Sequence, residues 1–156
     1  MRCGLGLSLK KYYAWFLLCC FVFTCICGIL MALLPKNLAM IFMVLPYLAS
    51  MISVLYLFLK QQQRAPTRQE MFHFAWVFNL LFWLFNLTGF VLSCVWQSWT
   101  HPEIDVWQFV QLYMLQPQVL FVASFIVVLI GLPFYLVTLW FFGPQARRMA
   151  KHMFGT

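Results

Sequence analysis

The stretch Met71–Gln97, MFHFAWVFNLLFWLFNLTGFVLSCVWQ, decides the fold class. It contains no Asp, Glu, Lys or Arg, and as a helix it is longer than the roughly 20 residues needed to cross the hydrocarbon core of a bilayer. The whole chain is 65% apolar, 20% aromatic and only 8% charged. So few charged side chains cannot cover a soluble globule. The composition therefore excludes a soluble enzyme, a disordered tail and a secreted disulfide scaffold.

Three further apolar runs are also long enough to cross a bilayer, at residues 12–34, 38–59 and 119–142. Lipid cannot satisfy exposed backbone groups, so each run must be a helix. The first run is too long for a signal peptide and no small-x-small cleavage site follows it, so we expect an uncleaved span. The sequence thus predicts an all-α, single-domain integral membrane four-helix bundle, with spans at 12–34, 38–59, 71–97 and 119–142.

The connections carry helix signals of their own. Thr67 and Glu70, at the end of the polar loop 60–70, have the spacing of a capping box and predict the start of the third helix. Thr100 and Glu103 repeat that spacing in the longest connection. Apolar residues with helical periodicity follow there, at Val106, Phe109, Val110, Tyr113, Met114 and Pro117. We expect this segment to be a periplasmic interfacial helix.

The distribution of Lys and Arg predicts the orientation. Nine of the ten lie in three segments that hold three basic residues each: Arg2, Lys10 and Lys11; Lys60, Arg64 and Arg68; Arg147, Arg148 and Lys151. The tenth, Lys36, lies between the first two spans. By the positive-inside rule we expect a multi-pass protein of the bacterial inner membrane with both termini in the cytoplasm.

The basic segments also predict lipid contacts. After Gly143 the chain has the pattern of a short basic cytoplasmic helix. We expect anionic headgroups to contact Lys10, Lys11, Arg147, Arg148 and Lys151. Topology accounts for the net charge of +7, so no nucleic acid partner is expected.

Two stripes predict packing faces. The first span carries a small residue at every fourth position: Cys20, Thr24, Gly28 and Ala32. Such a ridge lets two helix backbones approach closely. In the third span a polar residue recurs every seven positions, on one helix face: Asn79, Asn86 and Ser93. An amide in hydrocarbon is costly without a partner, so this stripe predicts contacts between helices or subunits, or else the wall of a small polar pocket.

The cysteines allow a redox or metal interpretation. Four lie in the first span, at Cys19, Cys20, Cys25 and Cys27, and neither periplasmic loop holds a partner for them. Cys94 near the periplasmic end of the third span leaves one bridge to the first span open. We favour small buried packing residues, because free Cys behaves as a small hydrophobe.

Catalytic and metal-binding patterns have little support. His101, Glu103 and Asp105 are two residues apart, and side chains at that spacing do not converge on a helix. Three acidic residues in the whole chain leave little material for acid–base catalysis. No buried carboxylate is available for a proton relay. We expect no catalytic residue, no metal and no cofactor.

Three elements are similar to those of one family. They are Arg64-Ala65-Pro66-Thr67 with Glu70, the LPY element Leu45–Tyr47, and the segment Gly143–Met149. They resemble a family of small four-span inner-membrane proteins of Acinetobacter and related gammaproteobacteria. The resemblance implies location and span number, and it implies no activity and no site residues.

Three functions are consistent with these patterns. We expect a non-catalytic accessory subunit or interaction partner in a membrane complex, bound to the lipid bilayer and to another membrane protein or a second copy of itself. The alternative is a small oligomeric transporter or channel without a proton-relay carboxylate, suggested by the Asn stripe and by Pro46 and Pro133 within the spans. A membrane enzyme or thiol oxidase has the least support.

Overall fold

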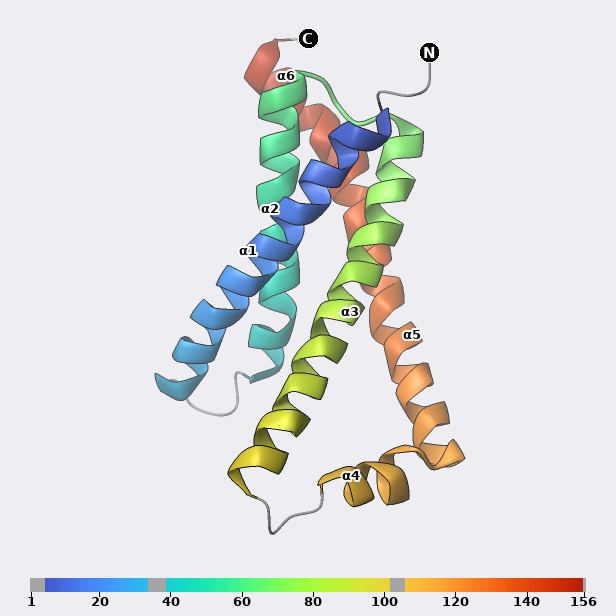
Figure 1. The fold of residues 1–156 in the computed structure, drawn as a ribbon. Helices are drawn as coiled ribbons and strands as arrows, with labels where there is room; N and C mark the ends of the chain where they lie inside the picture. The colour runs from blue at the N-terminus through green and yellow to red at the C-terminus, as the bar shows by residue number, and fades with distance from the viewer. Residues whose placement is uncertain (1–4, 34–38, 102–105, 156) are drawn as a thin grey trace.

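A computed structural model describes residues 5–33, 39–101 and 106–155. The helices follow in the order α1 (Leu5–Leu33), α2 (Ala39–Gln62), α3 (Arg68–Thr100), α4 (Val106–Phe109), α5 (Pro117–Trp140) and α6 (Ala146–Phe154) (Figure 1). Val110–Met114 continues α4 as a π-helix, and Phe141–Gln145 is a π-helix between α5 and α6. Within the described residues four helices are long and apolar enough to cross a membrane, as expected from the sequence.

The long helices form two pairs. α1 packs chiefly on α2, and α3 packs on α5, while a smaller contact between α1 and α3 joins the pairs. One end of the molecule holds the start of α1, the end of α2, the start of α3 and the whole of α6 (Figure 1). This is called the basic end here, because all the described Lys and Arg residues lie in its segments. α4 lies crosswise at the opposite end, between α3 and α5 (Figure 1).

The long connection differs from the expectation in one respect. α3 continues to Thr100, whose hydroxyl donates to the carbonyl oxygen of Trp96 at 2.9 Å. Thr100 is therefore the last residue of α3, and Glu103, the other residue of the expected capping box, lies outside the described residues. Pro117 does not belong to the short helical segment. It opens α5, where its missing N–H leaves no helical bond unmade.

The basic tail differs as well. Instead of a separate helix, α6 continues α5 through the π-helix Phe141–Gln145. One face of α6 packs against protein, since Ala146 and Ala150 are buried in the core. Gly143 lets this segment approach the start of α3: a Cβ there would lie 2.9 Å from Met71 Sδ. The basic side chains of α6 remain exposed.

Aromatic side chains fill the core. Phe16 of α1 stacks on Phe78 of α3 with ring centroids 4.2 Å apart, and Tyr47 of α2 stacks on Phe134 of α5 at 4.5 Å. Such pairs contribute about 0.5–1.5 kcal/mol beyond their burial. For helices that cross a membrane, lipid is as apolar as these side chains, so close packing rather than escape from water would hold them together. The ring contacts supply that packing.

One buried hydrogen bond joins α2 to α5. The hydroxyls of Tyr47 and Thr138 lie 2.7 Å apart, and Thr138 also donates to the carbonyl oxygen of Phe134 at 2.8 Å. A Thr hydroxyl has one hydrogen, and Thr138 uses it on Phe134, so Tyr47 is the donor between helices. The two bonds satisfy both hydroxyls away from water.

The start of α3 is capped as the sequence predicts. The Thr67 hydroxyl accepts from the backbone N–H of Glu70, and the Glu70 carboxylate accepts from the N–H of Thr67. Arg64 adds two bonds to that carboxylate, at 2.7 and 2.9 Å. Glu70, only 5% exposed, thus has partners on both oxygens. The hydrogen bonds with Glu70 raise the pKa of the Arg64 guanidinium above its usual value.

Replacing Tyr47 by Phe should lower the free energy of unfolding by about 0.5–1.5 kcal/mol, because the bond between α2 and α5 is lost while both rings can still stack. SDS titration of the purified protein in mixed micelles measures the change. Tyr56→Phe is the matched control, because Tyr56 is exposed on the same helix. Equal effects of the two variants would contradict the role of the Tyr47 bond.

Replacing Thr67 by Ala should destabilise the chain by about 1 kcal/mol, because one N–H in the first turn of α3 loses its acceptor. Thr88→Ala is the control. Its hydroxyl lies mid-helix and donates to the carbonyl oxygen of Leu84, which the helix already uses. The same SDS titration applies, and an unchanged midpoint for Thr67→Ala would rule out a stabilising cap.

Candidate functional site

Among the described residues, the cluster of buried core side chains lies in one half of the molecule, and Cys27 and Val106 are buried outside it. The buried core comes from α1 up to Cys20, from α2 beyond Pro46, from α3 up to Phe82 and from the chain beyond Gly131. This closed half lies toward the basic end. In the other half every residue of α5 from 117 to 130 is exposed, as are most of those from 24 to 33 in α1 and from 86 to 100 in α3. We call residues 24–33, 86–100 and 117–130 the open half.

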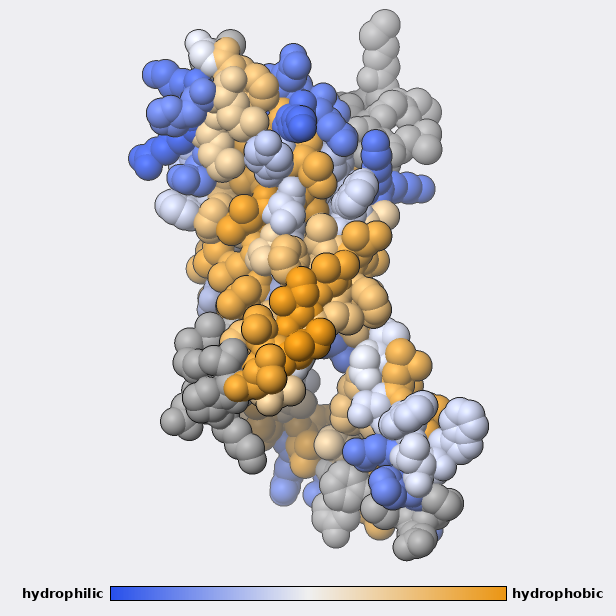
Figure 2. Space-filling view, turned by 90° about the vertical axis from the view of Figure 1, so that its left-hand side faces the viewer, coloured by the Kyte–Doolittle hydropathy of each residue, from blue (hydrophilic) through white to orange (hydrophobic). Residues whose placement is uncertain are grey.

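The pictures show the same contrast. The pair α1–α2 and the pair α3–α5 diverge away from the basic end (Figure 1). In the space-filling view the hydrophilic side chains gather at the two ends of the molecule, with hydrophobic side chains between them, and a gap lies in the half away from the basic end (Figure 2). The open half therefore presents helix faces that no described part of this chain covers.

The small-residue ridge of α1 is divided between the two halves. Cys20 is buried in the core, as a packing residue should be. Thr24, Gly28 and Ala32 are exposed in the open half, and a Cβ added at Gly28 would meet nothing within 4 Å. Cys27 is the buried residue of this region, although the four-residue spacing does not include it. Of the four described ridge residues, Cys20 is the one that packs in the core of this chain.

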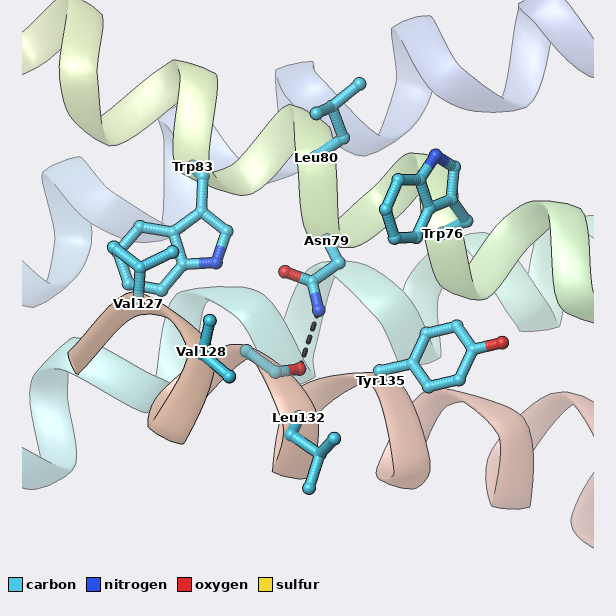
Figure 3. Close-up of a pocket in the computed structure, with 9 residues that line it drawn as sticks. Trp76, Asn79, Leu80, Trp83, Val127, Val128, Leu132 and Tyr135 are labelled. Carbon is cyan, nitrogen blue, oxygen red and sulfur yellow. Dashed lines mark hydrogen bonds between the residues drawn. The ribbon is translucent and has the colours of Figure 1, made fainter. Parts of the chain in front are cut away.

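The polar stripe of α3 is divided in the same way. The Nδ2 of Asn79 donates to the carbonyl oxygen of Gly131 in α5 at 2.7 Å (Figure 3). The Nδ2 of Asn86 instead donates to the carbonyl oxygen of Phe82, one turn earlier in its own helix, at 2.8 Å. Ser93 is exposed. Only Asn79 joins two helices, because a side-chain amide can also find a partner in its own backbone.

A groove lies beside the Asn79 bond, with a volume of about 470 Å³. It lies between α3 and α5, and its lining is almost entirely apolar: Trp76, Asn79, Leu80, Trp83, Val127, Val128, Gly131, Leu132 and Tyr135 (Figure 3). The indole Nε1 of Trp83 is buried and has no hydrogen-bond partner among the described residues. A Cβ at Gly131 would lie 3.4 Å from that nitrogen and 3.5 Å from Asn79 Oδ1. The sequence analysis allowed a small polar pocket along the stripe, but this groove is mostly apolar and Asn79 is the stripe residue that lines it.

The remaining predicted residues lie apart from the groove. Lys10, Lys11, Arg147, Arg148 and Lys151 are all exposed toward the basic end. The cysteines that the structure describes are free thiols, at Cys19, Cys20, Cys25, Cys27 and Cys94. In the described ranges no three His, Cys, Asp or Glu side chains gather as metal ligands, and Glu103 and Asp105 lie outside those ranges.

Comparisons with protein-family models, with curated proteins and with solved structures found no match to this chain. The resemblance to the four-span family therefore stays a prediction.

Replacing Asn79 by Leu should destabilise the protein by about 0.6 kcal/mol, the average for a hydrogen bond between membrane helices. Asn86→Leu is the matched control, because its amide bonds only to its own helix, and it should change stability little. SDS unfolding of both variants in parallel measures the difference. A larger loss from Asn86→Leu would contradict the division of the stripe.

Proposed function

We propose that this chain is a non-catalytic, multi-pass protein of the bacterial inner membrane and acts as an accessory subunit or interaction partner. Its partner is another membrane protein or a second copy of itself. The observation that carries the proposal is the open half, where Thr24, Asn86 and Ser93 are exposed within apolar helices. Small and polar residues are typical of interfaces between membrane helices, where they allow close approach and hydrogen bonding.

The charge distribution supports an orientation. The described Lys and Arg residues lie at the end that holds α6, so this end faces the cytoplasm and α4 faces the periplasm. Both termini are then cytoplasmic. Lys10 and Lys11 at the start of α1, and the basic residues of α6, contact anionic headgroups. These contacts account for the positive charge without a nucleic acid.

The use of the acidic side chains supports a non-catalytic role. Glu70 is the one acid in the described ranges, and its carboxylate is held by Thr67 and Arg64. A general acid or base must exchange a proton with substrate, and this carboxylate already accepts three hydrogen bonds.

A small transporter or channel has weaker support. Pro46 and Pro133 both lie inside continuous helices, and the amide donors of Asn79 and Asn86 are used within the chain. Transport sites built on proline-interrupted helices need free backbone and side-chain groups toward the substrate. The arrangement favours a surface for another protein over a pathway through this one.

The test is co-purification of the tagged full chain from native membranes in a mild detergent. Wild type should elute with a stoichiometric partner or as a dimer. The double variant Thr24→Leu, Gly28→Leu should reduce recovery of the complex about ten-fold, because bulky side chains keep the partner helix at a distance. The matched control is Phe21→Leu, Ile29→Leu, at similar depth on the same helix, where both side chains are exposed.

Two results would contradict the proposal. One is a wild-type chain that elutes as a monomer with nothing stoichiometric beside it. The other is an equal loss of complex in the control. SDS unfolding of each variant checks that the chain remains folded.

A further inference from the structure

The groove between α3 and α5 has the features of a small-molecule site. Its volume of about 470 Å³ lies within the roughly 300–1,000 Å³ of known ligand pockets, which are mostly apolar with a few polar groups. Its rim is exposed, at Trp76, Val128 and Leu132. Met71 is the first residue of the predicted third span, and Asn79 lies about 12 Å further along α3. At that depth the groove opens toward the lipid chains and not toward water.

Two polar atoms at the groove floor have unused hydrogen-bonding capacity. Trp83 Nε1 is a donor and is buried without a partner. Asn79 Oδ1 is an acceptor, and the hydrogen bond described for Asn79 uses only its Nδ2. A Cβ at Gly131 would lie 3.4 Å from Trp83 Nε1 and 3.5 Å from Asn79 Oδ1, so one small group could lie in contact with both atoms. An unpaired buried donor is destabilising, and a bound oxygen would remove that cost.

We propose that this groove binds a hydroxyl-bearing lipophile taken from the bilayer. Its hydroxyl oxygen accepts from Trp83 Nε1–H, and its hydrogen is donated to Asn79 Oδ1. Its apolar body lies along Val128 and Leu132. Trp83 Nε1 is buried, so binding requires the indole to turn toward the ligand.

The lining selects against other ligands. No charged side chain lines the groove, so an ionic headgroup would lose its hydration without a counter-charge. A carbonyl group could accept from Trp83 but could donate nothing to Asn79. A hydroxyl is a small neutral group that both donates and accepts.

The experiment uses the full chain in nanodiscs and two probes, 1-bromododecan-2-ol and 1-bromododecane. Bromine quenches tryptophan fluorescence on contact, and the probes differ only in the hydroxyl. We expect saturable quenching by the alcohol, with half-saturation at about five-fold lower concentration than for the alkane. Asn79→Leu should remove that difference, whereas Asn86→Leu should keep it.

Two further variants separate binding from folding. Gly131→Leu fills the groove floor and should abolish saturable quenching. The double variant Val128→Phe, Leu132→Phe narrows the rim at exposed positions, away from the buried core, and should weaken it about ten-fold. Val122→Phe is the matched control on the same helix, outside the groove, and should bind like wild type.

The proposal is overturned if both probes quench equally and without saturation. It is also overturned if the rim variant binds the alcohol as well as Val122→Phe does. Loss of a protein partner in the co-purification experiment would leave this result unchanged, because the groove lies in a different part of the surface from Thr24 and Gly28.

Discussion

Ring stacking between the two helix pairs is the interaction on which the arrangement of the four long helices depends. The rings of Phe16 and Phe78 lie 4.2 Å apart and within 5° of parallel, and they join α1 to α3. α1 otherwise packs on α2, and α3 on α5, so this stack, together with that of Tyr47 on Phe134, holds the two pairs together. Because lipid offers no hydrophobic drive toward association, a few well-packed rings decide where helices meet. Such rings lie toward the basic end, and there the bundle is closed.

The same constraint explains the two candidate surfaces. Beyond Cys20 and Phe82 the facing side chains no longer form such ring contacts, and the pairs diverge. On the outer side, Gly131 brings the backbone of α5 within reach of Asn79, and the missing side chain leaves the groove beside Trp83. One bundle therefore carries two different features: an uncovered half suited to a helix, and a narrow groove suited to a small molecule.

The sequence predicts the parts of the fold that depend on local rules. Helix number and the Thr67–Glu70 cap follow from apolar length and spacing, and both are found. Contacts that depend on which helices meet could not be predicted. The ridge predicted from a spacing of four residues includes Gly28, which is exposed, and omits Cys27, which is buried. The stripe groups Asn79 with Asn86, whose amide finds its own backbone. The role of Trp83 could not be predicted, because the groove beside it needs both α3 and α5.

The continuity of α5 with α6 has a mechanical consequence. Pro117–Phe154 forms one helical stretch of 38 residues. At about 1.5 Å per residue it is roughly 57 Å long, nearly twice the thickness of a bilayer core. In a bilayer this stretch would have to tilt, or extend beyond the hydrocarbon core, or both. Because α5 continues into α6 without a loop between Trp140 and Ala146, a displacement of α5 would be transmitted along the chain to Arg147 and Arg148.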